Sequence, residues 1–206
     1  MAQRKRQASS RRGAKKRNGG GLKAMAGAVL GGIGKMARAM GSDDNLDATD
    51  LLKAQHRYVE KLFAEIQKSN GARKAAAFRE LADMLAIHAT IEEKIFYPSV
   101  KTARTEDLLS ESVEEHLAMK RTLADLMQMD EDGDEFDATL KVLEEEVTHH
   151  AKHEEERKLF PLVRAEKDED FMAALAGEMI ALMVALDQRG NARAAVPSET
   201  SAAAPI

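Results

Sequence analysis

The sequence predicts an all-α protein: an up-down four-helix bundle with an extra C-terminal helix and disordered tails. Three observations carry this prediction. Between the tails, glycine and proline are scarce, apolar residues recur every three or four positions, and the intervals between periodic segments are short. Short connections between long helices favour antiparallel neighbours, and therefore an up-down bundle.

Capping and breaking residues set the bounds of the expected helices. The first helix begins near the capping candidate Asp47 and ends at Asn70-Gly71. We expect the second and fourth helices to end at Pro98 and Pro161, because proline interrupts a helix interior. The expected ranges are 48–69, 72–97, 106–129 and 135–160 for the bundle and 169–187 for the extra helix.

Composition divides the chain into four parts and excludes several classes of site. The parts are a basic, glycine-containing arm (1–44), the bundle (45–166), an additional helix (167–189) and a disordered tail (190–206). The chain has no cysteine, which excludes disulfides, cysteine-ligated zinc and thiol catalysis. It also has no apolar run of about 18 residues, so no helix is expected to span a membrane.

The charge is distributed unevenly. Residues 1–40 contain eleven Lys or Arg and no acidic residue, so with a net charge of −4 overall the remainder carries −15. Apolar residues at helical spacing in 22–40 favour an interfacial amphipathic helix, which four glycines make marginal in water. The interpretations left open for 1–40 are a solvated tail, an arm that binds anionic membrane or nucleic acid, an export signal, or a transit peptide.

Polar residues interrupt the apolar stripe of each bundle helix. They are His56, His88, Glu92, His116, His150 and Glu154, each at a position where the periodicity calls for an apolar residue. A lone histidine in such a stripe is usually a satisfied core residue. An ionised carboxylate, however, is costly to bury unless it is paired or binds metal. Six inward polar groups are too many to satisfy one another, so the pattern indicates a metal site.

The pattern is duplicated along the chain. The segment HATIEEKIFYP (88–98) resembles HAKHEEERKLFP (150–161), and a single histidine, His56 or His116, precedes each segment on its own helix. These motifs resemble the hemerythrin-like, or HHE cation-binding, domain family over about residues 50–165. The resemblance implies a non-haem di-iron centre, oxo- or hydroxo-bridged, with the six residues above as ligands and the two glutamates bridging the irons.

The second segment departs from the first by one residue. Its glutamate lies one residue further from its proline, so either a π-bulge absorbs the extra residue or Glu155 replaces Glu154 as the ligand. His149 and His153 form a further pair on the adjacent face. We interpret them as a solvated pair or as support for the ligands.

The predicted function is that of a cytoplasmic protein, or one bound peripherally to membrane, that binds or senses a small oxidant: O2, NO or peroxide. Mixed imidazole and carboxylate donors suit iron, zinc or manganese. No separate general base, nucleophile or phosphate loop is visible, so binding is favoured over catalysis. Two alternatives remain: a di-iron oxidoreductase that consumes peroxide or NO, and a metal-stabilised bundle whose basic arm binds anionic lipid or nucleic acid.

Overall fold

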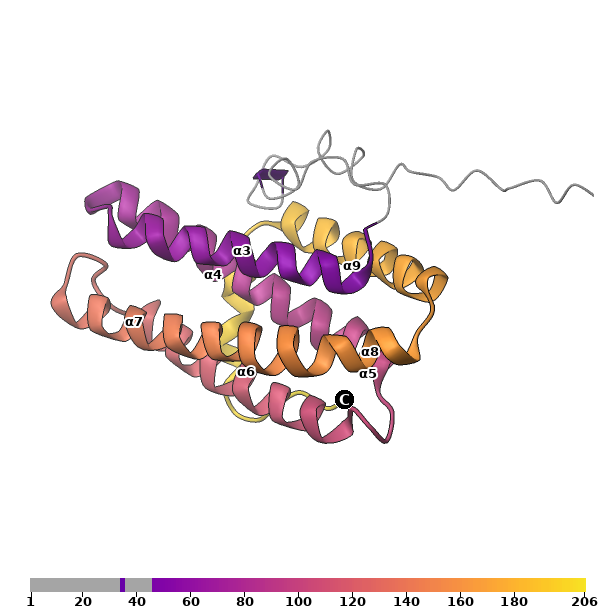
Figure 1. Cartoon of the computed structure of the whole chain (residues 1–206). Helices are drawn as coiled ribbons and strands as arrows, with labels where there is room; N and C mark the ends of the chain where they lie inside the picture. Colours follow the sequence, from indigo (N-terminus) through magenta and orange to yellow (C-terminus); the bar gives the residue numbers. More distant parts are fainter. Residues whose placement is uncertain (1–33, 36–45) are drawn as a thin grey trace, which may run out of the picture.

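A computed structural model describes residues 34–35 and 46–206 of the chain (Figure 1). Throughout 46–206 the regular structure is helical; η1 and η2 are π-helices and η3 is a 3-10 helix. The elements are α3 (Ala48–Gln67), α4 (Gly71–Ile91), η1 (Glu92–Phe96), α5 (Tyr97–Val100), α6 (Glu106–Leu126), α7 (Asp134–Thr148), η2 (His149–Leu159), α8 (Phe160–Glu166), α9 (Glu169–Arg189) and η3 (Ala192–Glu199). None of these helices has the length and apolar character that a bilayer crossing requires. The membrane or nucleic-acid arm predicted for 1–40 lies outside the described residues, apart from 34–35.

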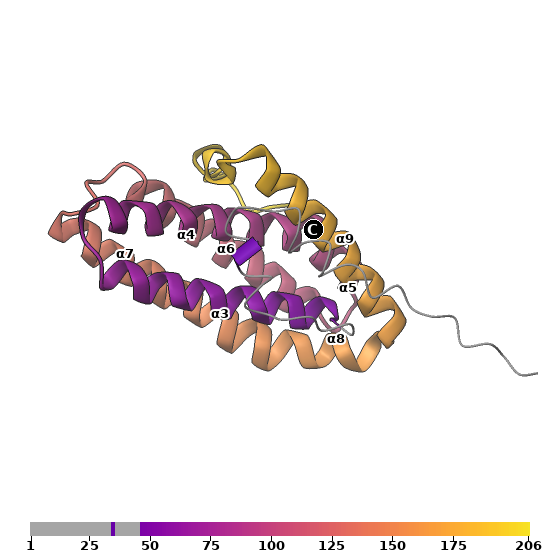
Figure 2. The same ribbon diagram turned by 90° about the horizontal axis from the view of Figure 1, so that it is seen from above.

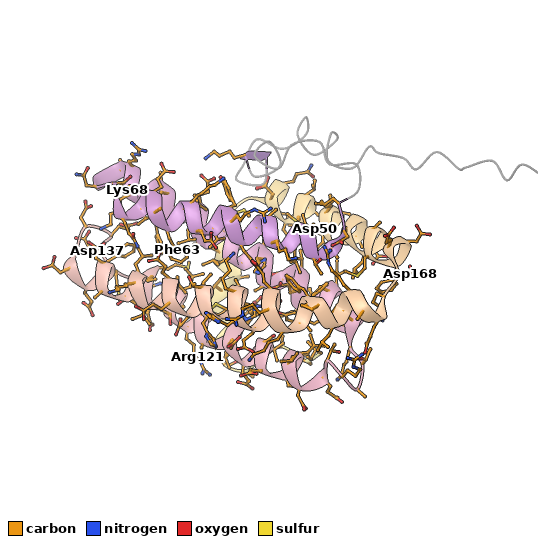
Figure 3. The ribbon with its side chains drawn as sticks, viewed as in Figure 1. Asp50, Phe63, Lys68, Arg121, Asp137 and Asp168 are labelled. Atoms are coloured by element: carbon orange, nitrogen blue, oxygen red, sulfur yellow. The ribbon has the colours of Figure 1, made fainter. Side chains whose placement is uncertain are left out.

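Two helical hairpins form the bundle. The first hairpin consists of α3 and α4–η1–α5, and the second of α6 and α7–η2–α8 (Figures 1 and 2). Both hairpin turns lie at one end, where the Gly71 amide donates a 2.9 Å hydrogen bond to Asp132. Lys68 and Asp137 mark this end in Figure 3, and Asp168 marks the other. The predicted four-helix bundle is confirmed.

Two of the bundle helices continue past the prolines at which we expected them to end. Pro98 and Pro161 lie in the first turn of α5 and α8. Proline is tolerated there because the first turn of a helix has no use for its missing N–H. The preceding π-helices shift the hydrogen-bond register, so that each proline meets the start of a new α-helical segment.

The last part of the chain packs onto the bundle. The predicted extra helix is α9, which lies against α3 and α4 of the first hairpin. After α9 the backbone turns through Gly190 and Asn191, both with positive φ, and η3 then crosses α4 and α6. The prediction that 190–206 forms a disordered tail was therefore wrong: Val196 is only 1% exposed. Two large apolar residues, Val196 and Ile206, lie far apart among small and polar ones, so the sequence has no periodic signal there.

Candidate metal centre

Six buried side chains meet between the four helices of the bundle. They are those of His56, His88, Glu92, His116, His150 and Glu155. α3 and α6 each contribute one histidine, whereas α4–η1 and η2 each contribute one histidine and one glutamate. The structure thus brings together five of the six predicted residues, with Glu155 in the place of Glu154.

The donor atoms form two adjoining groups, within each of which all atoms lie less than 4.8 Å apart. The first group is His56, His88, Glu92 and Glu155, and the second is Glu92, His116 and His150. Glu92 belongs to both. Its Oε2 lies 3.1 Å from His88 Nε2 and 3.2 Å from His116 Nε2. This carboxylate therefore joins the two groups.

Glu155 occupies the equivalent position on the other side. Its Oε2 lies 3.2 Å from His56 Nε2 and 3.7 Å from His150 Nε2. Its Oε1 accepts a 3.0 Å hydrogen bond from the hydroxyl of the buried Tyr97. Like Glu92, Glu155 lies between one histidine of the first hairpin and one of the second.

Every histidine of the cluster is held from outside through its Nδ1 atom. The pairs are His56 with Glu156 at 2.8 Å, His88 with Gln55 at 2.9 Å, His116 with Glu93 at 3.0 Å, and His150 with Glu115 at 2.7 Å. Each partner atom is an acceptor, so each Nδ1 carries the proton and donates it. The Nε2 atoms of the neutral rings then point their lone pairs into the cluster, the tautomer that metal-ligating histidines adopt.

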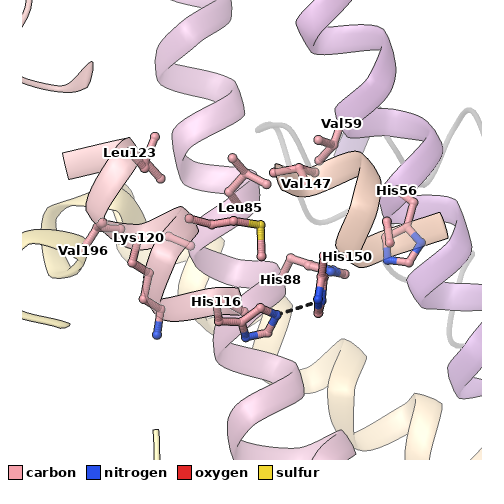
Figure 4. Close-up of a pocket in the computed structure, with 14 residues that line it drawn as sticks. His56, Val59, Leu85, His88, His116, Lys120, Leu123, Val147, His150 and Val196 are labelled. Carbon is pink, nitrogen blue, oxygen red and sulfur yellow. Dashed lines mark hydrogen bonds between the residues drawn. The ribbon is translucent and has the colours of Figure 1, made fainter. Parts of the chain in front are cut away.

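The inner atoms of this cluster do not satisfy one another. His116 Nε2 and His150 Nε2 lie 3.1 Å apart, two lone pairs facing each other unless one ring is protonated (Figure 4). Among the described residues, His56 Nε2, both oxygens of Glu92 and Oε2 of Glu155 have no hydrogen-bond partner. Such orphaned buried groups are costly, and a cation between them would satisfy all of them. The donor set fits a metal centre.

The electrostatics of the two carboxylates are unequal. Burial, and then the nearby Glu155 carboxylate, raise the pKa of Glu92 well above its usual value. Burial acts likewise on Glu155, but His150 and His56 outweigh it and lower the pKa of that carboxyl. Burial lowers the pKa of His88 well below its usual value, which keeps the ring neutral. A bound cation would favour the ionised form of both carboxylates and the neutral form of the ring.

The structure places Glu155, not the predicted Glu154, among the four histidines, and the π-helix is the reason. In a π-helix hydrogen bonds run from residue i to i+5, so residues five apart share a face. In η2 this places Glu155 on the face of His150, whereas the buried Glu154 accepts a hydrogen bond from Lys158 at 2.5 Å. The geometry agrees with the second alternative, in which Glu155 replaces Glu154, and the π-helix accounts for the shift. Counted from Glu92 and Glu155, the two prolines are equally distant.

His149 and His153 lie beside the cluster rather than in it. Their rings stack on each other, with centroids 5.5 Å apart. His149 is largely exposed, and its Nε2 lies 3.5 Å from Glu115 and 3.4 Å from Glu154. Because Lys158 already neutralises Glu154, this outer group is an ion-pair cluster. Its contact with Glu115, which holds His150, agrees with a supporting role.

Sequence reasoning missed the residues that hold the cluster. The side chains that accept from the imidazoles are those of Gln55, Glu93, Glu115 and Glu156. Two of them directly precede the single histidines, and two directly follow the inner glutamates. Tyr97 and Phe160 stack on His116 and His56, with centroids 5.6 and 6.1 Å apart. Aligning the two copies of the repeat residue by residue would have revealed all six positions.

A small apolar cavity adjoins the histidines. Its volume is about 40 Å³, and Figure 4 shows four of its wall residues, Leu85, Leu123, Val147 and Val196, beside the imidazoles. A water molecule needs roughly 10–15 Å³ of such space, so the cavity has room for a molecule of two or three heavy atoms. Its walls carry few polar groups beyond the imidazoles and Lys120.

Comparison with known proteins agrees with this geometry. A solved structure of a hemerythrin HHE cation-binding domain-containing protein from Mycobacterium kansasii matches with a TM-score of 0.65 at 24% identity, covering 75% of this chain and 99% of that one. A curated protein from Nostoc sp., named DNA nickase, is 29% identical over 164 residues; the match covers 79% of this chain, which spans only 46% of that relative. The model of the hemerythrin HHE cation-binding domain matches residues 47–163. The chain therefore belongs to the hemerythrin HHE cation-binding domain family.

Proposed function

We propose that this protein binds two iron ions and uses them to bind or sense a small oxidant: O2, NO or peroxide. The observation that carries the proposal is the position of the donor groups. They share Glu92, and their four histidines line one side of an apolar cavity of about 40 Å³. A shared carboxylate suits a pair of metal ions, and the cavity suits a ligand of two or three atoms.

Iron is the proposed metal because it suits the imidazole and carboxylate donors and could bind an oxidant in the adjoining cavity. Imidazole and carboxylate donors suit iron, zinc and manganese alike. When bound here, iron would supply a redox-active position for the oxidant, which zinc would not. Four neutral imidazoles also provide less negative charge than a carboxylate-rich site, which favours reversible binding over the formation of strongly oxidising species.

The protein's own residues would hold the metals and restrict access to them. Glu92 and Glu155, each between a histidine of either hairpin, would be shared by the two metals, and the outer acceptors fix the orientation of the imidazoles. Leu123, Val147 and Val196 exclude bulk water from the side facing the cavity. Tyr97 provides a hydroxyl group 3.0 Å from Glu155.

Metal analysis and an optical spectrum of the purified protein test this proposal. We expect about two irons per chain and charge-transfer absorption in the near-ultraviolet that changes on addition of azide, NO or peroxide. One zinc and no iron after expression in iron-replete cells would exclude it. Sustained consumption of peroxide or NO by the iron-loaded protein would shift the assignment to the alternative, a di-iron oxidoreductase.

The relative named DNA nickase favours a second candidate function, action on DNA. The eleven basic residues of 1–40 would supply affinity for phosphate, and the same charge would suit an anionic membrane. The buried metal centre is too enclosed to admit a phosphodiester, so nicking would require another part of the chain. A supercoiled-plasmid assay tests this candidate, and nicking by the His150→Ala variant would show that nicking does not depend on the metal centre. Binding to anionic vesicles without binding to DNA would instead support a membrane-binding role for residues 1–40.

A further inference from the structure

The outer wall of the cavity is formed by the end of the chain. We use the name C-terminal strap for residues 192–206, which follow α9 and comprise η3 and the residues after it. Val196 of the strap lines the cavity together with Met119 and Leu123 of α6 and Leu85 of α4. It is the strap's buried apolar anchor, at 1% exposed. The strap thus supplies one wall residue of a cavity that is otherwise lined by the bundle helices.

Polar contacts hold the strap in place on both sides of Val196. Arg193 forms an ion pair with Asp83 of α4, and its backbone N–H donates to the same carboxylate at 2.9 Å. Glu199 pairs with Lys120 at 2.9 Å. Beyond it, Arg121 donates to the carbonyl of Thr200 at 2.9 Å. Asp83, Glu199 and Arg193 are partly exposed, and ion pairs in such positions are individually weak.

One of these contacts continues to the metal centre. Lys120 Nζ, which pairs with Glu199, also donates to both oxygens of Glu93 at 2.9 and 2.8 Å. Glu93 in turn accepts from Nδ1 of His116. The strap therefore touches the site twice, through Val196 at the cavity and through Lys120 at the support of His116.

The other walls of the cavity belong to helices fixed by the core. α4 and α6 each bury a full face of apolar residues, whereas the strap fully buries one valine and packs Ala192, Ala203 and Ile206 only partly against the core. Segments with few buried apolar contacts open locally at the lowest free energy. Of the walls in the described chain, the strap is the one that opens most readily.

We propose that the C-terminal strap is the gate of the cavity, and that Val196 sets the size and rate of access of the molecules that reach the metal centre. This proposal rests on the proposed function only for the identity of the small molecule that enters the cavity. If the strap merely covered an apolar surface, changes at Val196 would alter stability without altering access.

The test measures access in full-length, iron-loaded protein by the association rate of azide, followed optically. Val196→Ala should raise this rate about tenfold, the change in an opening equilibrium produced by losing two buried methyl groups. Val196→Ile, which narrows the cavity, should lower it. Val142→Ala and Val142→Ile are matched controls, because Val142 of α7 is 50% exposed and does not line the cavity. Equal azide rates in both Val196 variants and wild type would overturn the gate.

A second variant tests the gate without changing the cavity wall. Glu199→Gln removes the ion pair to Lys120 and should raise the azide rate about twofold to fivefold, the range for a partly exposed pair. Glu145→Gln, at an exposed position on α7, is its control. A faster rate in Val196→Ala but not in Glu199→Gln would restrict the gate to the valine alone.

A metal-free readout separates the gate from the proposed function. Xenon fits small apolar cavities, and its exchange can be followed by nuclear magnetic resonance in protein stripped of metal. Faster xenon exchange in Val196→Ala than in Val142→Ala would support the gate even if the protein bound no iron. Unchanged exchange alongside normal iron and azide binding would reject the gate and leave the proposed function intact.

Discussion

The two hairpins of this protein build the same half-site with different residues. In each, the residue before the single histidine accepts from the second histidine, and the residue after the inner glutamate accepts from the single histidine of the opposite hairpin. An aromatic residue five positions after the inner glutamate stacks on that same single histidine. The two hairpins share this geometry, so the differences between them show which changes in spacing and charge the geometry tolerates.

The first difference is one of length. The pair His88 and Glu92 is four residues apart, and the pair His150 and Glu155 is five. The π-helical stretch after His88 covers five residues, whereas η2 covers eleven and includes His150 itself. A helix can therefore accept an extra residue within a site if its hydrogen-bond register changes from α to π there. The change to π-helical hydrogen bonding keeps the carboxylate of Glu155 in the cluster.

The second difference is one of charge. His88 donates to the neutral amide of Gln55, whereas His150 donates to the carboxylate of Glu115. A carboxylate partner makes the imidazole a stronger donor to metal. The two donor groups are therefore inequivalent, because both histidines of the group with His116 and His150 donate to carboxylates.

The largest effect is expected from breaking one half-site directly. His150→Ala removes an inner donor and should lower metal affinity more than about a hundredfold, since even supporting residues are worth tenfold to a hundredfold. His88→Ala should act similarly. His149→Ala and His153→Ala are the controls, because neither ring enters the inner groups. Metal content of the purified variants provides the measurement, and loss of metal in His153→Ala would contradict the placement of η2.

The next effect tests the π-helical frame. Glu155→Ala should lower metal content about as strongly as loss of a histidine, because Glu155 spans two imidazoles. Glu154→Ala should leave metal content near the wild-type value, since that side chain is paired with Lys158. Loss of metal in Glu154→Ala but not in Glu155→Ala would mean that Glu154, not Glu155, holds the metal.

A smaller effect tests the charge difference between the halves. Glu115→Gln gives the second hairpin the neutral acceptor of the first and should weaken metal binding about tenfold. Gln55→Glu makes the opposite change and should strengthen it. Competition with a chelator of known affinity measures both. Equal affinities in wild type and both variants would show that the outer charge has no effect on the metals.

The smallest effect concerns the aromatic pair. Tyr97→Phe makes the first hairpin match Phe160 of the second and removes the hydrogen bond to Glu155. We expect a loss of about 1–3 kcal/mol in the free energy of unfolding of the metal-free protein, measured by chemical denaturation. Phe96→Leu, at a buried position without a hydrogen bond, controls for packing. An unchanged stability would mean that the hydroxyl does not hold Glu155.

The fold and most of the site could be predicted because they depend on periodicity. Apolar residues at helical spacing fix which face of each helix is buried, and histidines within those stripes must point inward. The choice between Glu154 and Glu155 could not be settled this way, since periodicity assumes an α-helix throughout. The role of Pro98 and Pro161 was misread for the same reason. The strap was missed because Val196 and Ile206, ten positions apart among small residues, have no helical period.

The outer contacts also have a mechanical consequence. Glu156 of η2 holds His56 of α3, and Glu93 of η1 holds His116 of α6, so each hairpin fixes the orientation of a ring in the other. A metal ion that orders one pair of rings thereby aligns the supports of the second pair. The four imidazole rings then lose their conformational entropy when the first metal ion binds. The second metal ion should therefore bind more readily than the first. A metal titration of the empty protein is expected to pass from none to two with little of the singly loaded form.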